Sequence, residues 1–504
     1  MRPEPKQGDS GGREEMVSLE EAARRLGLSR STLQRMLRQG KLKGFKVGRQ
    51  WRFREADLDS FSRASHPAAA EVKVAEVDEA LGQLGPRLAG LAEFVLEPSP
   101  TGYPATEEEK AVERVLQAIL WAAVGAGASD VHIDATRRDT VVRHRLDGVL
   151  HELIHLPRYV HAALVAGIKV HAGMSAGQDQ LPQEGRFHLQ CNGKEYDIRA
   201  ATLPAIYGES ATMRLLDRRP EVLTLEHPHL GMSERDLVCY RAALAAPVGM
   251  IIAAGPSGCG KTSLIYAGLQ ELVKPDIKVV SVEDPVEFSF PWVTQVSVNP
   301  RVGLGFEQAL RGVLRVDPDV VMVGDLRTQP VADLAAQIAM TGHLVLGVLH
   351  ADSALGAIQR LLDIGVESFA LSQSLICVIG MRLARRVCEQ CGQPDEPAFS
   401  ILSPLAQRAR AGGYELPEHP RFRRGVGCDA CRRTGYRGRT GLHEVLAVTP
   451  EISRLVAARA PLETLREAAV KAGMTTLVAD GLRKAAEGIT SVAEVARLLP
   501  QDDR

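Results

Sequence analysis

A short apolar run in the middle of the chain, residues 250–254, ends in a glycine-rich segment with the spacing G-x-x-x-x-G-K-T. Glycines at such a turn let backbone N–H groups point inward around a polyphosphate, and the N-terminus of a following helix adds partial positive charge. Lys261 could reach the β- and γ-phosphates, and the Thr262 hydroxyl could bind Mg²⁺. The pattern therefore predicts that ATP with Mg²⁺ binds the loop residues Gly255, Pro256, Ser257, Gly258, Cys259, Gly260, Lys261, Thr262 and Ser263.

Acidic and imidazole side chains lie beside three further apolar runs, each of which we expect to be a strand. In parallel α/β sheets, ligands bind at the carboxyl ends of the strands. The set therefore predicts a site where acids and imidazoles converge on the phosphate chain, although any one acid could cap a helix and either histidine could fill the core. The residues are Glu283, Asp284, Glu287, Asp325, His343 and His350.

Two C-x-x-C pairs, Cys388 with Cys391 and Cys428 with Cys431, are separated by 36 residues. Four thiolates around Zn²⁺ make a closed structural site that has no open catalytic position. Two unrelated pairs in a reducing compartment are the alternative. We expect a zinc-binding insert.

Length and composition limit the number of domains and the class of protein that carry these motifs. With 504 residues, 45% hydrophobic and 24% charged, the chain should hold three or four soluble domains of about 100–200 residues each. Its net charge of −1 gives no overall basic field that would indicate nucleic acid. No apolar run of 18 residues and no signal-peptide core occur, so we expect a cytoplasmic protein.

Residues 16–65 have the organisation of a winged helix-turn-helix, with two short amphipathic helices followed by a basic strand pair. Ser18 is the expected cap of the first helix. The segment carries 12 Lys and Arg against 5 Asp and Glu, a net of +7, and it resembles the excisionase/MerR-like helix-turn-helix family. Binding of DNA and docking to a protein both remain open. The residues that could face base edges are Ser31, Thr32, Gln34 and Arg35.

Helix and strand periodicities divide the remaining chain. Residues 66–106 are expected to be a linker with a helical piece around Val77–Leu96, and Glu107–Val124 is expected to be an amphipathic helix. Thr140–Leu150 reads as a strand pair around a D-G turn. The predicted division is 1–15 disordered, 16–65 helix-turn-helix, 66–106 linker, 107–218 α/β domain, 219–245 interdomain linker, 246–386 nucleotide-binding core, 387–441 zinc subdomain and 442–504 helical subdomain.

From about residue 107 to about residue 500, the sequence resembles the ATPase superfamily of type II secretion and type IV pilus assembly. The motifs that carry the resemblance include G-A-S-D-V-H-I, R-L-D-G-V-L, L-P-Q-E-G-R, V-E-D-P-V-E and T-G-H-L-V-L, together with the tetracysteine segment. The resemblance implies an α/β protein with a RecA-like core preceded by a small PAS-like domain. It also implies a homohexamer recruited to the inner membrane by platform and adaptor proteins. The retraction ATPases of the superfamily lack the tetracysteine insert, so its presence favours assembly or secretion.

The same resemblance assigns roles to residues. Lys261 and Thr262 match the P-loop lysine and Mg²⁺ ligand, and Asp325 matches the catalytic glutamate of the Walker B strand. Arg199 and Arg214 match arginines that reach the phosphates from the α/β domain, and Arg186 is a weaker third candidate. The resemblance implies an acidic box of Glu283, Asp284 and Glu287 that helps to hold Mg²⁺ and water, and a histidine box of His343 and His350 that senses the γ-phosphate.

Three positions depart from the family pattern. Asp325 stands where the family has glutamate, and its side chain is one methylene shorter, so we expect slow hydrolysis. The residues after Arg327 lack the usual acids, and Ala351-Asp352-Ser353 replaces Thr-Asn-Asp. A motor ATPase is the favoured interpretation. An ATP-dependent DNA-binding regulator and a nucleotide-binding assembly subunit with weak turnover are the alternatives.

Overall fold

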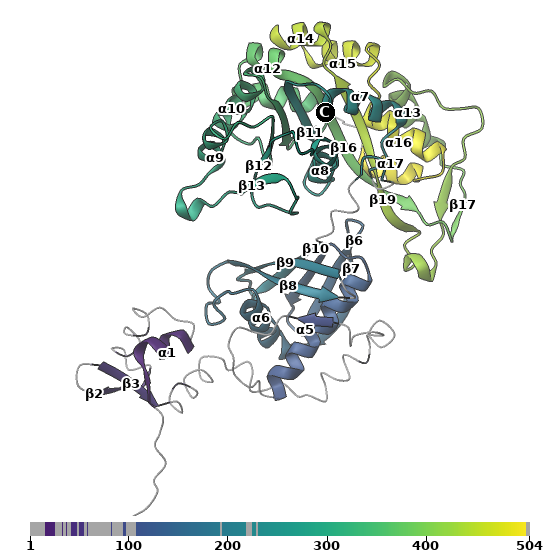
Figure 1. The fold of residues 1–504 in the computed structure, drawn as a ribbon. Coiled ribbons are helices and arrows are strands. Elements are labelled where there is room, and N and C mark those ends of the chain that lie inside the picture. Colours follow the sequence, from purple (N-terminus) through teal and green to yellow (C-terminus); the bar gives the residue numbers. More distant parts are fainter. Residues whose placement is uncertain are drawn as a thin grey trace, which may run out of the picture. The chain divides into compact units, whose positions relative to one another are not determined.

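The computed structural model describes most of the chain from residue 107 onward and shorter stretches before it (Figure 1). The described residues are 16–25, 33, 37, 42–47, 50–54, 58, 82, 94–96, 107–191, 194–217, 224–227 and 230–499. The chain forms two compact units, Met1–Arg218 and Arg219–Arg504. Each unit has a hydrophobic core of its own.

A small three-stranded sheet and one helix begin the first unit. Strand β3 (Gln50–Arg54) lies between β1 (Met16–Ser18) and β2 (Phe45–Val47) and pairs antiparallel with both. Helix α1 (Leu19–Arg25) follows, and the Glu21 N–H donates to Ser18 Oγ at 3.2 Å, which satisfies a backbone donor at the helix start. The predicted wing strands and cap are confirmed. Strand β1 was not predicted, because three residues are too few to show an alternating pattern.

The other described residues of the first unit form a seven-stranded antiparallel sheet and two helices. In spatial order its strands are β4 (Phe94–Leu96), β8 (Gln183–Cys191), β9 (Lys194–Leu203), β10 (Ser210–Asp217), β5 (Asp130–Ala135), β6 (Asp139–Leu146) and β7 (Val149–Pro157). Helices α5 (Glu107–Gly125) and α6 (Val160–His171) pack together on one face (Figure 1). The residues facing away from these helices are mostly polar, as expected for a sheet with one apolar face.

Two local predictions can be compared with this sheet. The D-G turn between β6 and β7 is confirmed, since Asp147 and Gly148 have φ angles of 46° and 85° and join neighbouring strands. The helical piece expected around Val77–Leu96 is wrong at its end. Residues 94–96 form β4, which pairs antiparallel with β8, and so this part of the expected linker belongs to the sheet.

Seven strands also make up the sheet of the second unit, and six of them run parallel. The spatial order is β13 (Val293–Ser297), β12 (Val279–Glu283), β14 (Val320–Val323), β15 (Leu344–Leu349), β11 (Gly249–Ala254), β16 (Leu375–Val387) and β19 (Tyr436–Ala447). The four strands predicted from apolar runs, β11, β12, β14 and β15, are all present and parallel.

Helices cover both faces of this sheet. On one face pack α7 (Glu234–Leu244) and α8 (Lys261–Leu272), and on the other pack α9 (Phe306–Val313), α10 (Gln329–Met340), α11 (Ala354–Asp363) and α12 (Ser368–Ser374). The central strands are therefore buried at every position. Burial on both sides explains why their sequences are continuous apolar runs rather than alternating ones. The predicted RecA-like α/β core has this three-layer arrangement.

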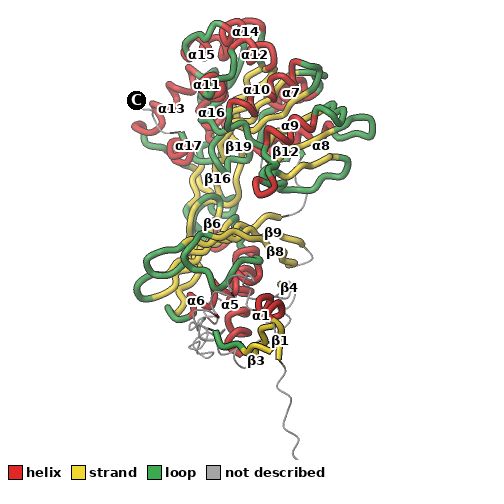
Figure 2. Tube along the Cα trace, turned by 90° about the vertical axis from the view of Figure 1, so that its left-hand side faces the viewer, coloured by secondary structure: helices red, strands yellow, loops and turns green. Residues whose placement is uncertain are grey.

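The last two strands of the sheet are long and antiparallel (Figure 2). Pairing continues to Val387 and Tyr436, and the residues between them form the insert, which contains β17 (Gly392–Pro394), α13 (Phe399–Ala411) and β18 (Arg423–Gly425). The predicted limits of the zinc subdomain, 387 and 441, thus overlap the two strands. They cut into β16 and β19, because the cysteine spacing marks the ligands and not the ends of the flanking strands.

The predicted helical tail is confirmed. It consists of α14 (Pro450–Ala457), α15 (Leu462–Lys471), α16 (Leu477–Ala486) and α17 (Val492–Leu498). Helices α16 and α17 pack over β16 and β19, and α13 packs against these two helices. Leu405, Leu482 and Val492 belong to the core that they form.

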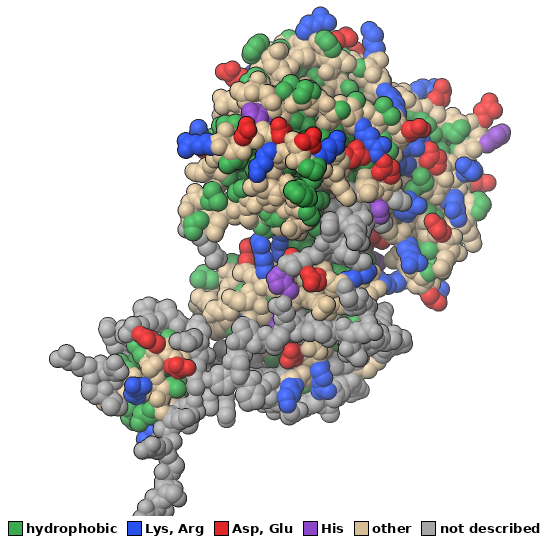
Figure 3. Space-filling view, viewed as in Figure 1, with side chains coloured by type: hydrophobic (Ala, Val, Ile, Leu, Met, Phe, Trp, Pro, Cys, Tyr) green, Lys and Arg blue, Asp and Glu red, His purple; other side chains and the backbone are tan. Residues whose placement is uncertain are grey.

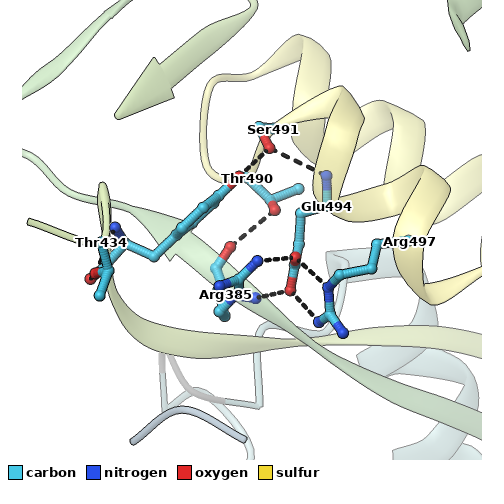
Figure 4. A network of polar contacts seen from close by, with 7 residues as sticks. Arg385, Thr434, Thr490, Ser491, Glu494 and Arg497 are labelled. Carbon is cyan, nitrogen blue, oxygen red and sulfur yellow. Dashed lines mark hydrogen bonds and ion pairs between the residues drawn. The ribbon is translucent and has the colours of Figure 1, made fainter. Parts of the chain in front are cut away.

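A polar network fastens α17 to β16 (Figure 4). The side chain of Glu494 is fully buried and accepts from Arg385 Nη2 at 2.7 Å and from Arg497 Nη2 at 2.7 Å. Thr490 Oγ1 donates to the Arg385 carbonyl oxygen at 2.8 Å. Burial alone would raise the pKa of the Glu494 carboxyl, but the two arginines lower it. The paired charges hold the C-terminal helix against a strand of the nucleotide-binding sheet.

Charged side chains of both signs are interspersed over the visible face of the second unit (Figure 3). This distribution agrees with the net charge of −1. Within the described part of the chain, no helix combines the length and the apolar character that crossing a bilayer requires.

Candidate nucleotide site and metal centre

The phosphate loop joins the buried strand β11 to α8 at the carboxyl edge of the sheet. Gly260, the N-cap of α8, has a φ of 97°, a conformation that side chains disfavour. Gly255 packs so closely on β16 that a Cβ atom there would lie 2.6 Å from the carbonyl oxygen of Met381. Pro256 and Ser257 are exposed at the top of the turn. The glycines therefore allow a compact loop with its backbone open to a ligand.

Lys261 turns back over this loop. Its Nζ donates to the carbonyl oxygens of Gly255 and Pro256, each at 2.8 Å, and the residue is buried. Burial lowers the pKa of the Lys261 ammonium, and the Arg382 guanidinium lowers it further, while Asp325 acts in the opposite direction. Carbonyl oxygens bind an ammonium without neutralising it. A polyphosphate held in the loop would supply the missing negative charge.

The remaining candidate ligands of Mg²⁺ are Thr262, Asp284 and Glu287. Thr262 lies half-buried in the first turn of α8, directly after Lys261. Asp284 is exposed and Glu287 is half-buried just beyond the end of β12. Hydroxyl and carboxylate oxygens are the ligands that Mg²⁺ prefers, so the donor set suits this ion.

Glu283 is engaged inside the protein. Its carboxylate is buried and accepts from Tyr266 Oη, from Ser281 Oγ at 2.5 Å and from Gln295 Nε2 at 3.3 Å. Tyr266 belongs to α8, so these bonds tie the helix after the loop to β12 and β13. Burial and the neighbouring carboxylate together raise the pKa of Tyr266. In this structure Glu283 positions the helix, and the sequence offered no sign of that partner.

Asp325 follows β14, beside the end of β12. It is buried and forms an ion pair with Arg327 through Oδ2. Its other oxygen, Oδ1, is buried and has no hydrogen-bond partner in the described structure. An unpaired buried carboxylate oxygen is costly unless a ligand or water satisfies it. The arrangement leaves one oxygen of Asp325 available to a water molecule.

The two histidines lie at opposite edges of the sheet. Leu349 pairs with Ala254, so His350 is level with the start of the phosphate loop. Burial and then the Lys261 charge lower the pKa of its imidazole. His343 precedes β15 at the other edge, where its carbonyl oxygen accepts from the Gly249 N–H. Six strand residues at about 3.3 Å each separate the two edges. His343 therefore lies at the edge opposite the phosphate loop, and its role as a γ-phosphate sensor stays a prediction.

The three arginines of the first unit form a row. Arg186 on β8 lies opposite Arg199 on β9, and Arg199 lies opposite Arg214 on β10. Directly opposite residues share a face of the sheet. This face is the one turned away from α5 and α6, because the adjacent Ile198 is buried in the core. Arg214 Nε donates to the buried carboxylate of Asp130 at 2.8 Å. Register brings together three candidates that are far apart in sequence.

The four cysteines of the insert converge. Their sulfur atoms lie within 4.8 Å of one another, with separations of 3.8 Å for Cys388 to Cys428, 3.7 Å for Cys391 to Cys431 and 3.7 Å for Cys428 to Cys431. A tetrahedron with zinc–sulfur bonds of 2.3 Å has edges of about 3.8 Å. The geometry of the cluster is compatible with zinc.

Backbone donors prepare one of these sulfurs for a metal. Cys431 Sγ accepts from the N–H groups of Cys428 and Gly435, each at 3.2 Å. Burial raises the pKa of the Cys431 thiol, but these bonds outweigh it and bring the pKa to about 6. Burial raises the pKa of Cys391 to about 11. Backbone donors are a common means of favouring thiolates.

The candidate base-contacting residues of the helix-turn-helix, Ser31, Thr32, Gln34 and Arg35, lie outside the described residues. Leu33, between them in sequence, is buried with Leu19, Leu42 and Phe53 in a small core. That core, together with α1 and the three-stranded sheet, is the part of the predicted domain that the structure describes.

Sequence comparison assigns the chain to a family. The sequence model described as Type II/IV secretion system protein matches residues 105–497, and a model described as Helix-turn-helix domain matches residues 16–64. The chain therefore belongs to the type II/IV secretion system protein family. Membership confirms the predicted class, an ATPase. The second model confirms that the N-terminal segment resembles a helix-turn-helix domain.

Individual relatives are similar over most of the chain. Type II secretion system protein E of Pseudomonas aeruginosa is 37% identical over 464 residues, covering 90% of this chain and 89% of the relative. The type II secretion system ATPase E of Vibrio cholerae is 38% identical, covering 78% and 76%. The type IV pilus assembly ATPase PilB of Thermus thermophilus is 37% identical, covering 78% of this chain and 43% of the relative.

Solved structures share the fold. The ATPase DotB of Legionella pneumophila aligns with a TM-score of 0.56 at 17% identity, covering 77% of this chain and 95% of that one. The pilus retraction motor PilT with bound ADP aligns with a TM-score of 0.53 at 21% identity, covering 77% and 97%. These similarities concern the fold alone.

Proposed function

We propose that the chain is the motor ATPase of a type II secretion or type IV pilus assembly machine. The observation that carries the proposal is the phosphate loop with its adjacent acids in a chain that is 37% identical, over 90% of its length, to a type II secretion protein E. In this proposal the chain is a homohexamer in the cytoplasm. Inner-membrane platform proteins and cytoplasmic adaptors recruit it to the membrane.

ATP would bind the loop from Gly255 to Ser263, with Lys261 at the β- and γ-phosphates. Mg²⁺ would be held by Thr262, with Asp284 and Glu287 nearby, and it neutralises charge on the phosphates when bound. Zn²⁺ held by the four cysteines would be structural, because a Cys₄ site has no open position.

Asp325 would orient the attacking water through its unpaired Oδ1. Arg327 holds the other oxygen and so fixes the plane of the carboxylate. His350, whose lowered pKa favours the neutral imidazole near pH 7, can donate or accept a hydrogen bond beside the γ-phosphate without adding a charge. The residues of the loop edge thus supply positioning and electrostatic stabilisation, the two demands of phosphoryl transfer.

Asp325→Glu is expected to raise kcat for ATP, by as much as about 10²-fold, because the longer side chain brings its oxygen closer to the attacking water. The measurement is the steady-state rate of phosphate release at saturating ATP. Asp319→Glu, the same change at the amino end of β14, is the matched control and should leave the rate unaltered. An unchanged or lower rate in Asp325→Glu would show that side-chain length does not limit turnover.

The match of residues 16–64 to a helix-turn-helix family supports a second candidate, an ATP-dependent regulator that binds DNA. To separate the two, ATPase rate and oligomeric state are measured with and without duplex DNA at two salt concentrations. The motor proposal expects ATP turnover by a hexamer with no change on adding DNA. Stimulation by DNA that weakens steeply with salt would favour the regulator. A hexamer that binds ATP without turnover would favour an assembly subunit.

A further inference from the structure

We infer that Arg382, on β16, is a further ligand of the nucleotide's phosphate chain, and that Asp352 holds its guanidinium when the phosphates are absent. The inference rests on the proposed nucleotide site. Neither residue belongs to the phosphate loop, the acidic segment or the histidine pair. Asp352 is also one of the positions where this chain departs from the pattern of its family.

The phosphate loop packs against strand β16. Ala254, the last residue of β11, pairs with Gly380, so Arg382 is level with the beginning of the loop. A Cβ at Gly260 would lie 3.1 Å from Met381 Cε. Together with the close approach of Gly255 to the Met381 carbonyl oxygen, this contact places both ends of the loop against the residue next to Arg382.

Arg382 and Lys261 place two positive charges close together beside the phosphate loop. The Arg382 side chain is 12% exposed, donates from Nη1 to the Met381 carbonyl oxygen at 3.2 Å, and is paired through Nη2 with Asp352 Oδ1 at 3.0 Å. It is near enough to Lys261 to contribute to the lowered pKa of that ammonium, after burial. Lys261 is bound by two carbonyl oxygens, and Arg382 by one carbonyl oxygen and one exposed carboxylate. Two neighbouring cations of this kind favour an anion between or beside them.

The carboxylate that holds Arg382 is an easily displaced partner. The side chain of Asp352 is 97% exposed, and exposed ion pairs contribute little because water screens them. A guanidinium bound to phosphate makes shorter, charge-assisted and often bidentate hydrogen bonds. The Arg382 guanidinium therefore gains more interaction free energy from a phosphate oxygen than it loses by leaving the Asp352 carboxylate. A purely structural ion pair that fastens the segment after His350 to β16 is the competing interpretation.

The two interpretations predict opposite effects of changing Asp352. Asp352→Asn frees the guanidinium, so we expect ATP to bind more tightly, by up to about fivefold. If the pair were structural, the same change would leave binding unaltered or weaken it. Arg382→Ala is expected to weaken the binding of ATP and ADP by at least about tenfold, with a smaller loss in Arg382→Lys, which keeps the charge.

The measurement is the Kd of the full-length protein for ATP and for ADP, each with Mg²⁺, by displacement of a fluorescent nucleotide. The ion pair of Arg410 and Glu415 in the zinc insert is the matched control, and Arg410→Ala and Glu415→Gln should leave both Kd values unchanged. In the double variant that combines Asp352→Asn with Arg382→Ala, the increase in ATP affinity caused by Asp352→Asn should shrink, because the guanidinium that it would release is missing. Melting temperatures of all variants separate loss of binding from loss of fold.

Failure of this inference can be told from failure of the nucleotide site itself. If wild type binds no nucleotide, or Lys261→Ala binds it as well as wild type, the proposed site is wrong. If Lys261→Ala loses binding while Arg382→Ala keeps the wild-type Kd, only the role of Arg382 is wrong. Equal effects of Asp352→Asn in the wild-type and Arg382→Ala backgrounds would show that Asp352 acts on the phosphates directly and not through Arg382.

Discussion

Lys261→Ala is expected to lower the rate of ATP hydrolysis by about 10²–10³-fold, the usual effect of removing one preorganised donor from developing charge. The ammonium is buried at the loop and bound to two carbonyl oxygens, so the site already holds it close to where phosphates would lie. Alanine removes both the charge and the side chain that crosses the loop. Phosphate release by the full-length protein, measured at saturating ATP and Mg²⁺, gives the rate.

A matched control for this variant is Lys274→Ala, two residues beyond α8. Lys274 is exposed and lies outside the loop, so its removal tests only the loss of one lysine from this part of the chain. Its rate should equal that of wild type. Turnover by Lys261→Ala at the wild-type rate would contradict the assignment of this loop as the catalytic nucleotide site.

Cys431→Ser is expected to release the metal and unfold the insert. Structural zinc sites contribute about 10–16 kcal/mol of apparent binding free energy. A short segment with a small hydrophobic core cannot gain as much folding free energy from packing alone. Cys431 is buried and its sulfur accepts two backbone hydrogen bonds that favour the thiolate. We expect one Zn²⁺ per chain in wild type, none in the variant, and faster amide hydrogen exchange across residues 388–435.

The control for the metal is Cys239→Ser. Cys239 is half-buried on α7 and does not belong to the cluster, so this variant should retain its zinc and the slow exchange of the insert. A wild-type protein that contains no stoichiometric zinc, or a Cys431→Ser variant that keeps it, would overturn the assignment. Treatment with a chelator should reproduce the exchange pattern of Cys431→Ser in wild type.

The parts of the site that sequence could predict are those encoded by local spacing. The phosphate loop needs glycines at fixed offsets and a lysine at the helix start, and both are visible in the run from Gly255 to Lys261. The cysteine pairs are equally local. The four buried strands are apolar at every position because both faces of the sheet are covered, and this made them recognisable without any knowledge of their neighbours.

What sequence could not predict depends on register and strand direction. The side-by-side arrangement of Arg186, Arg199 and Arg214 follows from pairing between strands whose order the sequence does not state. The distance of His343 from the phosphate loop follows from the parallel pairing of β15 with β11, which puts the residue before β15 at the opposite edge of the sheet. Arg382 escaped notice since an arginine in a strand becomes informative only when that strand is known to border the loop.

The zinc insert leaves and re-enters the sheet at one place, because Val387 and Tyr436 are paired neighbours. Residues 388–435 therefore connect two neighbouring antiparallel strands, as the loop of a long β-hairpin does. The entropy of closing a loop grows slowly, by about 0.6 kcal/mol for each doubling of its length. The length of this segment could therefore change without changing the neighbour of any strand, and a bound metal would stabilise the loop.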